Sequence, residues 1–150
     1  MPGHRFAIVV SRFNGDITDG LLDGARAALR EAAVPDEHVT VVHVPGAFEI
    51  PITAQRLAER GTFDAIICLG CLIKGETMHF EYIAEAASHG IALAASATGV
   101  PMAFGVLTTM TEEQATERSV AGPGNKGREA AAAAIEMAAL FKRLDAEAKS

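Results

Sequence analysis

Four runs of apolar residues punctuate the chain, and each ends in a polar turn. They are RFAIVV (5–10), HVTVVHV (38–44), DAIICLG (64–70) and PMAFGVL (101–107). Short continuous apolar runs bounded by turn residues predict strands that are buried on both faces of a sheet.

The segments between these runs carry apolar residues at helical spacing. The predicted helices are Leu21–Ala33, a segment within 47–60 with Pro51 in its first turn, Phe80–Gly90, a short helix opened by a capping box at Thr111-Glu112-Glu113-Gln114 and ending at Arg118, and a long Ala-rich helix from Lys126 to about Leu144. We expect the tail DAEAKS to be frayed.

Alternation of buried strands with helices predicts an α/β protein. We expect a three-layer αβα sandwich with a flavodoxin-like parallel sheet of four strands in the order 2-1-3-4. The length of 150 residues matches one domain, residues 1–150. Ligands of such folds bind beyond the carboxyl ends of the strands, which here lead into SRFNGD, PGAFE, IKGETMH and TTMTEE.

Composition narrows the choice of partners. Hydrophobic residues make up 49% of the chain, more than one small core requires, and part of this surface is expected in subunit contacts. The net charge of −6 and the lack of a Lys/Arg run argue against nucleic acid. The apolar runs are too short for a membrane helix and residues 1–6 lack a signal-peptide layout, so we expect a cytoplasmic protein that does not enter a membrane.

Cys68 and Cys71 have the spacing of a redox pair or of half a zinc site. They lie in the apolar run AIICLGCLI, and no second cysteine pair exists in the sequence. Buried, reduced thiols are therefore the favoured interpretation.

His79 stands where the third strand gives way to a helix. The N-terminus of a helix favours anions and the neutral, proton-accepting form of an imidazole, which makes His79 a candidate catalytic base. The alternative is that it merely caps a surface turn. Gly75, Glu76 and Thr77 precede it and offer backbone N–H groups and a hydroxyl to a phosphate or carbonyl oxygen, although a polar turn alone has this composition.

Other turns present aromatic and charged residues. Phe13 and Phe48 follow strand ends, where a planar ligand, a neighbouring chain or the core must cover them. Glu49 is either a hydroxyl-binding carboxylate or a charge favourable at a helix N-terminus. Arg118 and Lys126 flank a Gly-Pro-Gly break. Taken singly, none of these residues establishes a function.

Together the turns resemble one family, 6,7-dimethyl-8-ribityllumazine synthase, over about residues 5–144. The matching segments are SRFN (11–14), VPGAFEIP (44–51), GCLIKGETMHFEY (70–82), FGVLTT (104–109), EEQATER (112–118) and GNKG (124–127). The resemblance implies a transferase of riboflavin biosynthesis that condenses 5-amino-6-(D-ribitylamino)uracil with 3,4-dihydroxy-2-butanone 4-phosphate, without metal or organic cofactor.

The resemblance also implies roles for the candidate residues. It implies that Phe13 stacks on the pyrimidine, whose edge meets the backbone of Leu72 and Ile73. The ribityl chain is then lined by Ala47, Phe48 and Glu49. The phosphate-bearing substrate lies among Gly75, Glu76 and Thr77 beside the proton shuttle His79, and its phosphate binds Arg118. Each site lies between neighbouring subunits, with Phe104, Arg118 and Lys126 coming from the adjacent chain.

The implied assembly is a homopentamer, either alone or as the unit of a sixty-subunit shell, with riboflavin synthase as a candidate partner. This chain departs from the family pattern at Val120 and Gly122, where a Gly and a Lys are usual. The affinity for phosphate near these positions can therefore differ from that of the family. The alternative function is a catalytically silent protein that binds flavin or lumazine, or that forms a shell.

Overall fold

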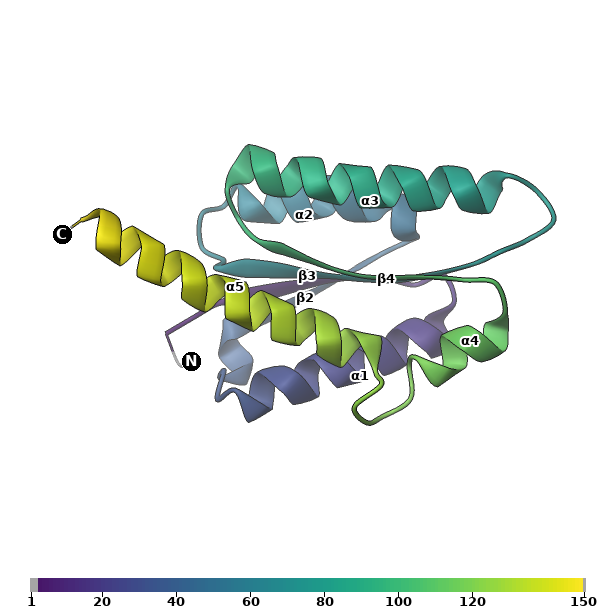
Figure 1. Ribbon diagram of the computed structural model, residues 1–150, viewed down its shortest axis with the longest axis horizontal. Coiled ribbons are helices and arrows are strands. Elements are labelled where there is room, and N and C mark those ends of the chain that lie inside the picture. Colours follow the sequence, from purple (N-terminus) through teal and green to yellow (C-terminus); the bar gives the residue numbers. More distant parts are fainter. Residues whose placement is uncertain (1–2, 150) are drawn as a thin grey trace.

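A four-stranded parallel sheet forms the middle layer of the computed structural model, which describes residues 3–149 (Figure 1). Its strands are β1 (Phe6–Ser11), β2 (Val39–Val44), β3 (Ala65–Ile73) and β4 (Met102–Thr109). The order is β2-β1-β3-β4, and every neighbouring pair is parallel. The predicted topology is therefore confirmed.

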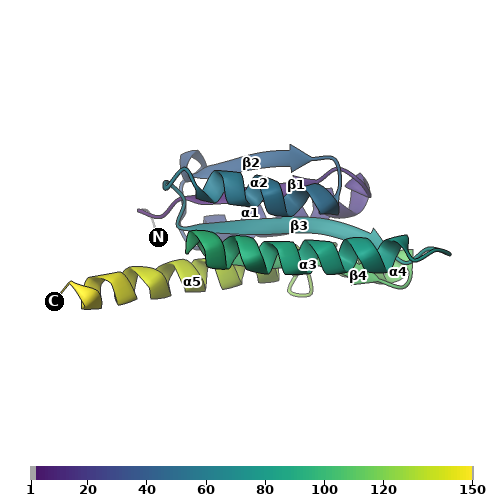
Figure 2. The ribbon, with the colours of Figure 1, turned by 90° about the horizontal axis from the view of Figure 1, so that it is seen from above.

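Helices cover both faces of this sheet (Figure 1). They are α1 (Gly15–Glu31), α2 (Ile50–Ala58), α3 (His79–Thr98), α4 (Glu112–Glu117) and α5 (Lys126–Ala148), with short 3₁₀ turns η1 (Asp36–His38) and η2 (Ala47–Glu49). Helices α2 and α3 lie side by side on one face, whereas α1 and α5 cover the other; α5 extends past the end of the sheet (Figures 1 and 2). This is the predicted αβα sandwich.

Alternate side chains of each strand enter two separate cores. In β1, Phe6 and Ile8 pack toward α1 and α5, whereas Ala7 and Val9 pack toward α2 and α3. All four side chains are fully buried. Because burying a Val, Ile or Phe side chain contributes about 1.5–3 kcal/mol, continuous apolar strands are the main stabilising feature of this fold.

Close packing between α1 and α5 depends on glycine. A methyl group at Gly127 would overlap the backbone of Leu21, and one at Gly24 would overlap the side chain of Asn125. These two glycines allow the first turn of α5 to lie directly against α1. The start of α5, and with it Lys126, is thereby fixed relative to the sheet.

The predicted end of α3 at Gly90 is wrong, since the helix continues to Thr98. Gly90 is not a helix stop but a point of close approach, where an added Cβ would lie 2.8 Å from Cγ of Pro51 in α2. The helix is instead capped by Gly99, which follows Thr98, has a left-handed φ of 73° and donates its N–H to the carbonyl of Ala95. Helix α5 likewise runs beyond Leu144, so the predicted frayed tail is helical to Ala148.

The two cysteines are free and buried on β3, as the sequence favoured. Because their spacing on a strand is odd, Cys68 faces the α2–α3 core and Cys71 faces the α1–α5 core. Burial raises the pKa of the Cys68 thiol to about 12, and burial together with the Asp16 carboxylate raises that of Cys71 to about 11. Such a pair cannot close a disulfide within one strand.

Candidate functional site

A cleft of about 560 Å³ opens beyond the carboxyl ends of β1, β2 and β3. We call it the first cleft. It lies between η2 and the beginning of α3, where a parallel sheet of this type binds ligands. Its lining comprises Phe13, Pro45, Gly46, Ala47, Phe48, Glu49, Leu72, Ile73, Gly75, Thr77, His79, Phe80 and Ile83.

Phe13 stands in the first cleft with 66% of its surface exposed. Its turn is held by three hydrogen bonds: the N–H of Phe13 donates to the carbonyl of Pro45 at 3.1 Å, that of Arg12 donates to the carbonyl of Val44 at 2.8 Å, and Nδ2 of Asn14 donates to the carbonyl of Cys71 at 3.0 Å. Asn14 caps α1 in the left-handed conformation. A rigid turn thus presents an aromatic ring to open space, which suits the stacking of a planar ligand.

Phe48 and Glu49 lie in the 3₁₀ turn η2 and also line the first cleft. The N–H of Glu49 donates to the carbonyl of Gly46 at 3.2 Å, and its own carbonyl accepts from the Thr53 hydroxyl at 2.9 Å. The proline of Ile50-Pro51 lies at the start of α2 and fixes the backbone direction there. Phe48 is 58% exposed, and the partly exposed Glu49 carboxylate is a ready acceptor for hydroxyl groups.

The loop between β3 and α3 reaches away from the sheet and carries the exposed residues Gly75, Glu76 and Thr77 (Figure 1). His79 begins α3, and its backbone N–H donates to the Thr77 hydroxyl at 3.3 Å. An ion pair of 3.0 Å between Lys74 Nζ and Glu81 Oε1 joins the two ends of the loop. The hydrogen bond from Lys74 lowers the pKa of the Glu81 carboxyl.

A second cleft of about 260 Å³ runs along the edge strand β4, where the strand meets α5. Its lining comprises Phe104, Gly105, Val106, Leu107, Thr108, Thr109, Arg118, Lys126, Glu129 and Ala130. The two clefts share no lining residue. Of the residues that the structure describes, two cationic side chains line the second cleft and none lines the first.

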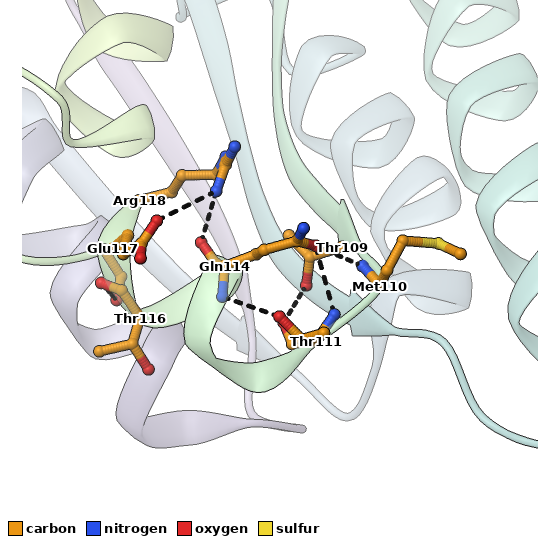
Figure 3. Close-up of polar contacts among 8 residues, drawn as sticks. Thr109, Met110, Thr111, Gln114, Thr116, Glu117 and Arg118 are labelled. Carbon is orange, nitrogen blue, oxygen red and sulfur yellow. Dashed lines mark hydrogen bonds and ion pairs between the residues drawn. The ribbon is translucent and has the colours of Figure 1, made fainter.

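Helix α4 positions Arg118 (Figure 3). A capping box opens this helix, with the Thr111 hydroxyl accepting from the N–H of Gln114 at 3.2 Å and the Gln114 side chain accepting from the N–H of Thr111. One guanidinium nitrogen of Arg118 donates to the Gln114 carbonyl at 2.9 Å and lies 3.9 Å from the Glu117 carboxylate. Arg118 also lines the second cleft, where a guanidinium group is a suitable partner for an anion such as phosphate.

Lys126 reaches the same cleft from the first turn of α5. Its backbone N–H donates to the carbonyl of Arg118 at 2.8 Å, and its Nζ pairs with Glu129 at 2.8 Å. Both cationic side chains are 42% exposed, so each can reach an anion entering from solvent.

The structure divides the predicted site residues into two groups. Phe13, Ala47, Phe48, Glu49, Leu72, Ile73, Gly75, Thr77 and His79 line the first cleft, whereas Phe104, Arg118 and Lys126 line the second. Glu76 lies on the exposed loop and lines neither.

Sequence reasoning did not single out Phe80 and Ile83, which close the first cleft from α3. In the sequence, both are simply apolar positions at helical spacing. Asn125 was also missed, because its sequence context shows only a helix-capping residue type and its contact with Gly20 is long-range.

In the described part of the chain, no group of three or more His, Cys, Asp or Glu side chains is arranged so that it could hold a metal ion. Within the same residues, no helix is long and apolar enough to cross a membrane.

Comparison with known proteins shows to which family the chain belongs. The family model for 6,7-dimethyl-8-ribityllumazine synthase matches residues 3–142. A 6,7-dimethyl-8-ribityllumazine synthase of Salinibacter ruber (strain DSM 13855 / M31) is 51% identical over 145 residues, which cover 97% of this chain and 93% of the relative. The chain therefore belongs to the 6,7-dimethyl-8-ribityllumazine synthase family.

Proposed function

We propose that this chain condenses 5-amino-6-(D-ribitylamino)uracil with 3,4-dihydroxy-2-butanone 4-phosphate to form 6,7-dimethyl-8-ribityllumazine in riboflavin biosynthesis. The family membership supports this reaction. The observation that carries the assignment to residues is the pair of clefts, one with exposed aromatic rings, a carboxylate and a histidine, the other with two cations. They correspond to the two substrates, one planar and polyhydroxylated, the other anionic.

The pyrimidine substrate binds in the first cleft. Its ring stacks on Phe13, and the backbone of Leu72 and Ile73 at the end of β3 meets the polar edge of the ring. The ribityl chain then extends past Ala47 and Phe48, where Glu49 accepts hydrogen bonds from its hydroxyl groups. Both substrates and the product are small molecules, so this role requires no macromolecular ligand.

The phosphate group of the second substrate binds Arg118 and Lys126. In one chain these cations line a different cleft from His79, on the edge strand β4. One complete site consequently forms when the second cleft of one subunit faces the first cleft of its neighbour, which also brings Phe104 to the substrates. Gly75, Glu76 and Thr77 lie on the loop that faces this junction.

We propose a homopentamer as the assembly that makes such junctions, either free or within a larger shell. Closed rings join two different surfaces of neighbouring chains, which suits the pairing of two different clefts. Several large apolar side chains are exposed in the isolated chain, and a ring would cover part of this surface: Ile52, Met78, Tyr82, Leu93, Phe104 and Met110. A cytoplasmic location and an association with riboflavin synthase belong to the same proposal.

The reaction needs proton transfers and correct placement of two reactants. The 5-amino nitrogen attacks the ketone carbon and water leaves, which forms an imine. Loss of a proton and departure of phosphate generate an enol, whose carbonyl tautomer is attacked by the ribitylamino nitrogen; a second loss of water closes the ring. Each step moves a proton onto or off nitrogen, carbon or oxygen.

His79 is the proposed proton shuttle for these steps. It lines the first cleft at the beginning of α3 and is exposed, so an imidazole nitrogen can reach bound substrate. Proton transfer by a positioned side chain contributes about 10²–10⁴-fold. Arg118 stabilises the departing phosphate, and holding both substrates in one site supplies much of the remaining acceleration.

The direct test is to mix purified protein with both substrates in neutral buffer containing a chelator. Lumazine formation is followed by absorbance and fluorescence against the uncatalysed background. We expect a protein-dependent rise that the chelator does not abolish. A rate equal to the background, with tight binding of lumazine or flavin retained, would contradict the proposal and favour a binding protein.

A further inference from the structure

Asn125 is the most thoroughly hydrogen-bonded polar side chain near the second cleft. It is 1% exposed, and it lies between the cations Arg118 and Lys126 in the sequence. Its Nδ2 donates to the carbonyls of Gly20 at 3.1 Å, Ser119 at 2.9 Å and Val120 at 3.1 Å. Two amide hydrogens are therefore shared among three carbonyls.

The other end of the Asn125 side chain serves a different purpose. Its Oδ1 accepts from the backbone N–H of Arg128 at 3.0 Å and thus caps α5. One carboxamide consequently links three parts of the fold: helix α1 at Gly20, the loop 119–125 after Arg118, and the first turn of α5. Removing the carboxamide would take this donor from one buried carbonyl and two partly buried ones, and an unsatisfied buried acceptor costs more than a lost solvent-exposed hydrogen bond.

The fold makes space for this side chain in a specific way. Residue 24 faces Asn125, and any side chain there would overlap the carboxamide; the residue is glycine. The loop also approaches α1 closely at Gly20, where an added methyl group would overlap the Ser119 carbonyl. These contacts leave the loop 119–125 little freedom to shift along α1.

We infer that Asn125 is a positioning residue for phosphate binding, because its carboxamide closes the loop 119–125 and so holds the Arg118 and Lys126 side chains on the same cleft. Asn125 does not line that cleft and touches no substrate. Its effect passes through the loop, whose ends are also joined by the 2.8 Å hydrogen bond from Lys126 N–H to the Arg118 carbonyl. The inference rests on the proposed function, which assigns phosphate to these two cations.

Asn125→Asp separates loop closure from helix capping. A carboxylate oxygen still accepts from the N–H of Arg128, and aspartate is as good a helix cap as asparagine. Its second oxygen, however, faces the carbonyls of Gly20, Ser119 and Val120 and repels them. Asn125→Ser is the second variant, since serine caps α5 but is too short to reach three carbonyls. Leu29→Ala is the control, because it removes buried apolar surface in α1 without lining either cleft.

The readouts are inorganic phosphate affinity by titration calorimetry and the KM of each substrate, measured on the assembled protein. For Asn125→Asp or Asn125→Ser we expect phosphate affinity to fall about tenfold, the equivalent of about one to two neutral hydrogen bonds. The KM for the butanone phosphate should rise in parallel, while the KM for the pyrimidine stays within about twofold of wild type, a selectivity consistent with positioning rather than general destabilisation. Leu29→Ala should lower stability and leave both affinities unchanged.

The inference is overturned if a folded Asn125 variant binds inorganic phosphate as wild type does, or if Leu29→Ala weakens phosphate binding equally. It is also overturned if the wild-type protein binds no phosphate. Loss of phosphate affinity in the variants, combined with no lumazine formation by wild type, would support the positioning role while refuting the proposed reaction. Should Asn125→Asp not fold, the comparison of Asn125→Ser with Leu29→Ala decides the question.

Discussion

The backbone N–H of Lys126 donates to the carbonyl oxygen of Arg118 at 2.8 Å, so the loop between these two cations is closed at its base. Both side chains line the second cleft as a result, although one follows α4 and the other begins α5. Two half-exposed cations with a fixed backbone at one cleft suit anion binding, because their backbone need not be brought together when the anion binds.

Arg118→Lys should weaken binding of the phosphate-bearing substrate while leaving the pyrimidine affinity unchanged. Lysine keeps the charge but lacks the planar fork that makes paired hydrogen bonds to phosphate. We expect the KM for the butanone phosphate to rise about tenfold, the equivalent of one charge-assisted hydrogen bond. Steady-state kinetics with each substrate varied in turn test this; an equal change in both KM values would contradict the assignment.

Phe13→Leu should weaken pyrimidine binding without a large loss of stability. The ring is 66% exposed, so its removal takes little surface from the core. Stacking of a base on an aromatic side chain is worth about 1–3 kcal/mol, which predicts a rise in the pyrimidine KM of about five- to 150-fold. Leucine retains apolar bulk but no π face. Unchanged pyrimidine affinity would show that Phe13 does not stack on the substrate.

Thr111→Ala should destabilise the protein by about 1 kcal/mol, because it removes the hydroxyl that caps α4. Since Gln114 of the same capping box holds the Arg118 guanidinium through its carbonyl, we also expect a modest rise in the KM for the phosphate-bearing substrate (Figure 3). Denaturant unfolding and kinetics measure the two effects. Thr116→Ala is a control on the same helix. It should change both the free energy of unfolding and the KM for the phosphate-bearing substrate less than Thr111→Ala does.

Native Cys68 and Cys71 should resist thiol reagents at pH 8. Their pKa values in the folded chain, about 12 and about 11, leave almost no thiolate at that pH, and both are buried. These pKa values lie above those of the same thiols in the unfolded chain, so the folded state binds the thiol protons more tightly. The resulting contribution to the free energy of unfolding is fully present below about pH 9 and is lost as the pH rises toward 11–12. Labelling followed by mass spectrometry, with and without denaturant, tests this. Rapid modification of the native protein would contradict the burial of both thiols.

The sheet could be predicted from sequence because buried parallel strands leave continuous apolar runs, and DAIICLG has no other reasonable interpretation in an α/β alternation. Helix ends were less predictable. Glycine is common at helix ends, so Gly90 resembles a helix terminus in the sequence. Only its close approach to Pro51 across the α2–α3 interface shows that it is a packing residue. The local sequence indicates only which conformations a segment prefers. Whether a glycine ends a helix or allows close packing depends on a residue far away in the sequence.

The candidate site was predictable in composition but not in arrangement. His79, Phe13 and Glu49 all follow strand ends, and topology brings such turns together. The resemblance to a family suggested that Arg118 and Lys126 come from another chain, but only the fold reveals the second cleft on β4. Asn125 could be recognised from sequence only as a candidate helix cap, because its contact with Gly20 of α1 depends on the fold.

Subunit complementation tests most directly whether the two clefts form one catalytic site across neighbouring chains. His79→Ala and Arg118→Ala are each purified as inactive or nearly inactive proteins, unfolded together in equal amounts, refolded and assayed for lumazine formation. If each site combines the first cleft of one subunit with the second cleft of the next, random mixing restores about a quarter of the wild-type sites. Activity no higher than the sum of the separately refolded variants would contradict the shared site.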